Sequence, residues 1–79
     1  MFYLYVLRGE DGRHYVGYTS DLKKRFEQHQ GGLNSSTRYQ RWRLVYYEDY
    51  EREDLARERE RKLKAHGRSY QLLIARLSE

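Results

Sequence analysis

Side chains that could transfer a proton or bind a phosphate crowd the stretch "YVGYTSDLKKRFEQH", residues 15–29. A tyrosine hydroxyl can orient a water or accept its proton. An arginine guanidinium offers a planar fork of donors that matches a phosphate, and a histidine titrates near neutral pH. Tyr15, Arg25 and His29 supply all three types here. The combination suits proton transfer beside a bound phosphate, provided that the fold brings these side chains together.

A β-hairpin is predicted to position the tyrosines. Residues 2–8 and 13–19 are rich in β-forming residues and flank the turn signal "GEDG". If residues 10–12 form a three-residue loop with Gly12 in the left-handed conformation, the register follows. The expected pairs are Gly9 with Arg13, Leu7 with Tyr15, and Tyr5 with Gly17.

In that register Tyr5 and Tyr15 lie diagonally on one face of the hairpin. Gly17 has no side chain and leaves space beside the Tyr5 ring. A slip of one residue would send one of the two tyrosines to the opposite face. The shared face is therefore a prediction that coordinates can test.

A helix over residues 21–30 is predicted to carry the arginine and the histidine, with Thr19 or Ser20 as its cap and the glycine pair 31–32 at its end. Leu22, Arg25, Phe26 and His29 fall on one side of it. Arg25 and His29 therefore flank the apolar seam that must dock on the sheet. Lys23 and Lys24 lie further round, towards solvent.

The remaining elements are predicted as a strand at about 44–50, a charged amphipathic helix at about 52–64, and a last helix. The apolar stripe of the second helix consists of Leu55, Ala56 and Leu63, and Gly67 is expected to end it. Ser69 then caps the last helix; its expected buried side consists of Tyr70, Leu73, Ile74 and Leu77. The fold class is α/β (α+β): a small three-stranded antiparallel sheet flanked by helices, in the order β-β-α-β-α-α.

The acids of the second helix differ in direction. At about 100° per residue, Glu60 lies at the edge of the apolar stripe, whereas Asp54 and Glu58 project away. Glu60 is the carboxylate best placed to face the body of the protein. It could also be one more member of the i,i+4 pairs in "RERERK", for example with Lys64.

Composition limits the class of protein. A chain of 79 residues without cysteine has room for a single domain, residues 1–79, held by packing alone. No apolar run approaches a bilayer span or a secretory signal, so a soluble cytoplasmic protein without membrane contact is expected. The net charge is +4, and residues 1–43 hold eight Lys and Arg against four Asp and Glu. That excess suits a polyanionic partner.

Tyr5, Tyr15, Arg25, His29 and Glu60, in this order, resemble the active-site set of the GIY-YIG nuclease superfamily. Its two name motifs appear in degenerate form as residues 3–5, "YLY", and residues 15–17, "YVG". "TSDLKKRFEQH" and "ARERERKLK" follow, so the resemblance covers essentially the whole chain. It is closest to the small members that consist of little more than the catalytic module.

The resemblance implies a Mg²⁺-dependent endonuclease acting on DNA, branched or damaged DNA included, as in repair. Glu60 would hold one Mg²⁺ or Mn²⁺ ion, which prefers oxygen ligands. Arg25 would bind the phosphate, and His29 would take or relay a proton. By the same resemblance Tyr5 would be the base and Tyr15 would position the water, or the two roles would be reversed.

The chain departs from the family pattern in two places. Tyr3 stands where the family name has glycine. Some members place an asparagine after the metal-binding glutamate, whereas the asparagine here is Asn34, far earlier. His66 or Arg68 are the candidates to replace it.

A second group of residues is a candidate nucleic-acid surface: Lys23, Lys24, Arg38, Tyr39, Arg41 and Trp42. In the loop "TRYQRWR" the arginines suit phosphates and the rings suit base stacking. Tyr39 and Trp42 would equally well pack under the third strand. Two other functions stay open: a nucleic-acid-binding scaffold with little cleavage of its own, and a module that needs a protein partner for specificity.

Overall fold

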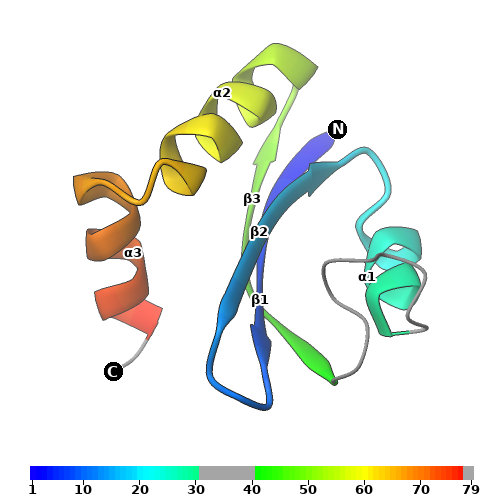
Figure 1. Cartoon of the computed structure of the whole chain (residues 1–79). Coiled ribbons are helices and arrows are strands. Elements are labelled where there is room, and N and C mark those ends of the chain that lie inside the picture. The colour runs from blue at the N-terminus through cyan, green and yellow to red at the C-terminus, as the bar shows by residue number, and fades with distance from the viewer. Residues whose placement is uncertain (31–40, 78–79) are drawn as a thin grey trace.

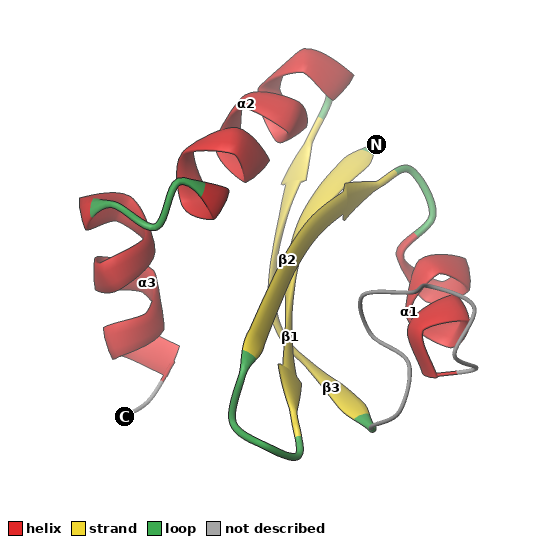
Figure 2. Cartoon of the chain, in the orientation of Figure 1, coloured by secondary structure: helices red, strands yellow, loops and turns green. Residues whose placement is uncertain are grey.

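The computed structural model describes residues 1–30 and 41–77. Its elements follow the predicted order, β-β-α-β-α-α (Figure 2). They are β1 (Phe2–Gly9), β2 (His14–Thr19), α1 (Leu22–Gln30), β3 (Trp42–Tyr50), α2 (Glu53–Lys64) and α3 (Arg68–Leu77). Within these described ranges, no helix has the length and apolar character that a membrane crossing requires.

The three strands form one antiparallel sheet in the order β2-β1-β3, so β1 is the central strand. Helix α1 lies on one face of this sheet, and α2 and α3 lie on the other (Figure 1). Because side chains alternate across a strand, successive residues of β1 contact different helices. The sheet therefore has two apolar sides to bury.

Each face carries its own core cluster. Of the described residues, five buried side chains pack on the α2 and α3 side: Leu4, Val6, Val16, Leu63 and Leu73. Three pack on the α1 side: Tyr5, Leu7 and Trp42, with Tyr15, Leu22 and Phe26 against them. The tyrosine hydroxyl and the indole of the second cluster make it the more polar of the two.

The predicted hairpin is confirmed in register and in turn conformation. Gly12 has a φ of +86°, the left-handed region that glycine tolerates. The Gly9 N–H donates to the Arg13 carbonyl at 2.8 Å. The cross-strand partners include Leu7 with Tyr15 and Tyr5 with Gly17, so Tyr5 and Tyr15 share a face.

The third strand starts at Trp42, two residues before the predicted Leu44. The side-chain amide of Gln30, at the end of α1, donates to the Trp42 carbonyl at 2.6 Å and accepts from the Trp42 N–H at 3.0 Å. It thus satisfies the backbone of Trp42 as a neighbouring strand would. A long-range contact of this kind leaves no local pattern in the sequence.

The cap of α1 differs from the prediction. The Asp21 carboxylate accepts the Lys24 N–H at 3.0 Å and is the cap. Thr19 acts one step earlier, since its hydroxyl oxygen accepts the Asp21 N–H at 3.1 Å. Neither Thr19 nor Ser20 is therefore the cap, and the helix begins at Leu22.

The link between α2 and α3 also differs from the prediction, in the residue that ends α2 and in the residue at which α3 begins. His66, not Gly67, has the positive φ, 56°, and its ring stacks on Tyr70 at 4.1 Å between centroids. Helix α3 begins at Arg68, so Ser69 lies inside its first turn rather than at its cap. In α2, Leu55 is 45% exposed and does not belong to the apolar stripe, whereas Ala56 and Leu63 are fully buried.

A carboxylate on β3 ties α2 to the sheet. Glu48 receives hydrogen bonds from the Tyr46 and Tyr50 hydroxyls and from the Arg59 guanidinium, whose Nε lies 3.0 Å from the carboxylate. Both partners of this ion pair are mostly shielded from solvent. Because Arg59 is the residue before Glu60, the Arg59–Glu48 ion pair also sets the rotation of α2 about its own axis.

Candidate active site

Tyr5 occupies the centre of the candidate site. It projects from β1 towards α1 and is 1% exposed. A Cβ added to Gly17 on the neighbouring strand would lie 2.5 Å from the Tyr5 hydroxyl oxygen. The tyrosine therefore lies across the bare backbone of Gly17, as the pairing register predicts.

The Tyr5 hydroxyl is hydrogen-bonded to His29. Its oxygen lies 2.8 Å from Nε2 of the imidazole, which is fully buried at the end of α1. Burial, with a further contribution from Tyr15, raises the pKa of Tyr5 well above its usual value. Burial and the Arg25 charge lower the pKa of His29. Both groups are therefore neutral at pH 7, and they form a buried pair through which a proton can pass.

Tyr15 lies against this pair from β2. Its ring centroid is 4.9 Å from the His29 ring, in edge contact, and 6.4 Å from the Tyr5 ring. Its ring also makes an edge contact with the Trp42 ring, at 6.3 Å between centroids. Tyr15 is thus held by aromatic contacts while it remains partly exposed at the surface.

A pocket of about 400 Å³ lies at the β2 edge of the sheet, where side chains from α1 and α2 also line it. It is lined by Tyr5, Tyr15, Gly17, Tyr18, Thr19, Ser20, Arg25, Glu53 and Glu60. Four of the five predicted catalytic residues therefore border one cavity, and the fifth, His29, lies behind Tyr5. The five come from four elements: β1, β2, α1 and α2.

Glu60 brings a carboxylate to this pocket from α2. The Lys64 ammonium lies 3.5 Å from Oε2 of Glu60, which is the i,i+4 pair that the sequence allowed. The same ammonium is 5.6 Å from the centre of the Tyr15 ring. Glu60 thus has both the helical ion pair and a place in the pocket.

The oxygen donors of the pocket fit a hydrated Mg²⁺ ion. Within residues 1–30 and 41–77 no group of three or more His, Asp or Glu side chains is arranged to hold a metal. Mg²⁺ keeps several of its waters and needs only one or two carboxylates, which Glu60 and Glu53 provide. A Zn²⁺ ion, which takes three or four protein ligands, does not match this set.

Five residues of the pocket lining lie outside the predicted catalytic set: Gly17, Thr19 and Ser20, for which other roles were predicted, and Glu53 and Tyr18, for which none was. Glu53 stands seven positions before Glu60, which is about two helical turns, so both carboxylates project from one side of α2. Tyr18 lines the pocket from the end of β2. The seven-residue spacing is visible in the sequence, but the direction in which this side of α2 faces depends on its docking.

The residues predicted to contact nucleic acid differ in their exposure to solvent. Lys23, Lys24 and Arg41 are exposed. Trp42 is 3% exposed and packs with Tyr5 and Leu7, so its ring cannot stack on a base; here the packing alternative is correct. Arg38, Tyr39 and Asn34 lie outside the described residues. Neither His66 nor Arg68 lines the pocket to which Glu60 contributes.

Comparison with known proteins agrees with this architecture. The model of the GIY-YIG catalytic domain matches residues 1–72. UPF0213 proteins of Streptococcus pyogenes serotypes M5 and M2 are each 41% identical over an alignment 58 residues long, which covers 68% of this chain. That region is 61% of the length of those relatives, so the chain spans less than two thirds of them.

A solved structure extends the similarity to the fold. The solution NMR structure of the UPF0213 protein BH0048 from Bacillus halodurans matches with a TM-score of 0.59 and 29% identity. The match covers 98% of this chain and 85% of that one. Since the family model matches nearly the whole chain, this protein belongs to the GIY-YIG catalytic-domain family.

Proposed function

We propose that residues 1–79 act as one catalytic domain, a Mg²⁺-dependent endonuclease that hydrolyses phosphodiester bonds in nucleic acid, with DNA as the first substrate to test. Membership of the GIY-YIG family supports a nuclease-like activity. The observation that carries the proposal is the meeting of Arg25, Glu60 and the Tyr5–His29 pair at one pocket.

In this proposal Arg25 binds the non-bridging oxygens of the scissile phosphate with its fork of donors. Tyr15, which lines the pocket and is partly exposed, orients the attacking water. Glu60 and Glu53 would hold the Mg²⁺ ion, which when bound stabilises negative charge on the phosphoryl oxygens and on the leaving alkoxide.

Tyr5 and His29 would activate the water as a unit. Because the raised pKa of the Tyr5 phenol keeps it protonated at pH 7, Tyr5 does not act as a deprotonated base before the reaction begins. It would accept the water proton while its own proton passes to Nε2 of the neutral His29. The hydroxide attacks phosphorus, the bond to the leaving oxygen breaks, and the departing alkoxide takes a proton from solvent.

The first test compares two carboxylates of the same helix. Glu60→Gln should lower cleavage of plasmid and branched DNA in Mg²⁺ by about 10²-fold or more, because it removes a charged metal ligand. Glu58→Gln is the matched control: Glu58 is exposed, paired to Arg61 and absent from the pocket lining. Circular dichroism verifies that both variants remain folded.

Equal cutting by the wild type and by Glu60→Gln would contradict the proposal and indicate a contaminating nuclease. DNA retained at low salt without any product would favour the binding scaffold. Cleavage that appears only with a co-purifying protein would favour the partner-dependent module.

A further inference from the structure

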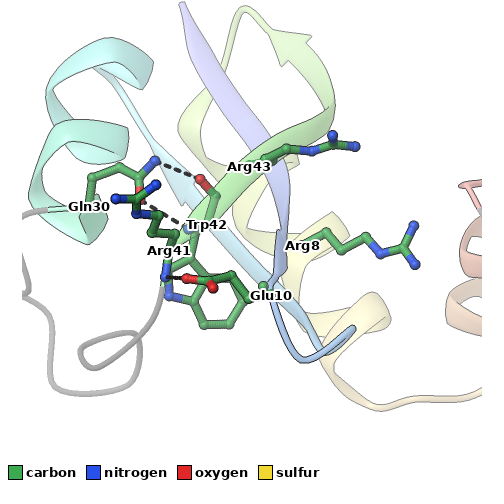
Figure 3. A pocket seen from close by; sticks show the side chains of 7 residues that line it. Arg8, Glu10, Gln30, Arg41, Trp42 and Arg43 are labelled. Carbon is green, nitrogen blue, oxygen red and sulfur yellow. Dashed lines mark hydrogen bonds between the residues drawn. The ribbon is translucent and has the colours of Figure 1, made fainter.

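Two arginines are cross-strand neighbours on one face of the sheet, at the end away from the pocket. In the observed register Arg8 of β1 lies opposite Arg43 of β3, and on its other side opposite His14 of β2. Figure 3 shows the Arg8 and Arg43 side chains extended to the same side, while Gln30 and Arg41 lie on the other. The two guanidinium groups thus form one cationic surface across two neighbouring strands.

No carboxylate in the described part of the chain neutralises this pair. Arg8 and Arg43 are both exposed, and neither takes part in an ion pair there. The neighbouring acids are engaged elsewhere: Asp11 pairs with Arg13, and the Glu10 carboxylate accepts the Arg41 N–H at 2.8 Å. Like charges directly opposite on antiparallel strands destabilise a sheet, so an anion bound between them would relieve a repulsion.

His14 does not add a third charge to the row. Burial and the nearby Arg8 lower the pKa of His14, so it is neutral at pH 7 and can serve only as a hydrogen-bond partner. Arg8 and Arg43 also border a hollow of about 670 Å³ at this end of the sheet. The hollow is lined by Gln30 and Arg41 as well, which lie on the other side from the Arg8 and Arg43 side chains (Figure 3), so the anion site inferred here is the exposed strand surface that carries the two guanidinium groups and not the hollow.

This surface is separate from the catalytic pocket. Arg8 stands three residues after Tyr5 on the same strand, so its side chain points to the opposite face, at a distance along the strand of about 10 Å. Neither Arg8 nor Arg43 lines the pocket of Tyr5 and Glu60. An anion at the arginine pair therefore cannot be the phosphate that reacts.

We propose that Arg8 and Arg43 form a second contact with the nucleic-acid backbone, a clamp that positions the substrate and does not touch the reacting phosphate. The inference rests on the proposed function only in taking the partner to be a nucleic acid. The sheet register places Arg8 on the central strand, which also carries Tyr5, and Arg43 beside it on β3.

The experiment measures binding without cleavage. Anisotropy of a short labelled DNA duplex is titrated in EDTA at several salt concentrations, for the wild type and for Arg8→Gln/Arg43→Gln. Each lost phosphate contact removes about 0.9 from the slope of log K against log salt, so the double variant should lose about 1.8. The control is Arg57→Gln/Arg61→Gln, which removes the same charge from the exposed side of α2 and should keep the slope.

Equal slopes for the wild type and the Arg8/Arg43 variant would overturn the proposal. A second measurement follows the Nε–H NMR signals of the two arginines. Shifts with the duplex support a backbone contact, whereas shifts with inorganic phosphate and none with the duplex show a small-anion site and contradict it. A reduced slope in a protein that never cleaves DNA would refute the proposed hydrolysis and leave the clamp standing.

Discussion

At the scale of single residues, the site depends on the absence of a side chain at position 17. The Tyr5 hydroxyl occupies the volume that a Cβ of residue 17 would take, and the same hydroxyl meets His29. The glycine of the second motif is thus required for space, since its φ is not in the left-handed region. Its role is to let one ring reach the buried imidazole.

Gly17→Ala should therefore displace the Tyr5 ring and break its hydrogen bond to His29. The expected cost is about 1–3 kcal/mol of stability, the range for overpacked cores, together with loss of cleavage. Urea denaturation and a cleavage assay measure the two effects. Gly67→Ala is the control, because nothing lies within 4 Å of its added Cβ; its stability should change by less than about 0.5 kcal/mol. A stable, active Gly17→Ala variant would show that the close packing is not needed.

At the scale of elements, the contact between α2 and β3 decides where the Glu60 carboxylate points. Burial raises the pKa of Glu48, but hydrogen bonds from Arg59, Tyr46 and Tyr50 outweigh it and lower the pKa overall. Glu48 is thus charged at neutral pH and holds Arg59, the residue beside Glu60.

Glu48→Gln should leave the Arg59 charge partly shielded and unpaired. We expect a loss of about 1–3 kcal/mol in stability, and weaker Mn²⁺ binding measured by electron paramagnetic resonance because α2 is less firmly oriented. The exposed ion pair of Glu58 with Arg61 offers the comparison: because solvent screens this pair, Glu58→Gln should cost less stability than Glu48→Gln and leave Mn²⁺ binding unchanged. Identical behaviour of the two variants would mean that the Glu48 tie does not orient α2.

At the scale of the whole molecule, a chain of 79 residues without cysteine is held by packing, and in its described part nine hydrophobic side chains are buried. Its total stability should be roughly 4–12 kcal/mol, at about 0.05–0.15 kcal/mol per residue. Leu63 is fully buried and joins α2 to the sheet and to Leu73 of α3. One such contact is therefore a large fraction of the total.

Leu63→Ala should cost about 2–5 kcal/mol, the range for a leucine removed from a core. Leu55→Ala, on the same helix but 45% exposed, should change the stability by less than about 0.5 kcal/mol. Urea denaturation curves of the two variants give both values. Similar costs for Leu55 and Leu63 would contradict the observed rotation of α2.

Local patterns were sufficient to predict much of this protein. The alternation of β-forming residues and the loop "GEDG" predict a hairpin register that puts Tyr5 over Gly17, and helical spacing places Arg25 and His29 on the docked side of α1. These predictions succeed because turn chemistry and periodicity act over a few residues. Leu55 and Gly67 show where local patterns fail. A helix with few apolar residues has two rotations that fit the same periodicity, so the exposure of Leu55 was not predictable. Either of two adjacent residues, His66 or Gly67, could end the helix.

Only the tertiary structure decided which groups meet. The burial of Trp42, the orientation of Glu53 and Glu60 towards one pocket, and the opposition of Arg8 and Arg43 all depend on contacts between distant segments. A sequence states which side chains are present and how they repeat, and these determine the elements. The free energy that docks α2 and β3 on β1 comes from many weak long-range contacts, and no short stretch of residues encodes their sum.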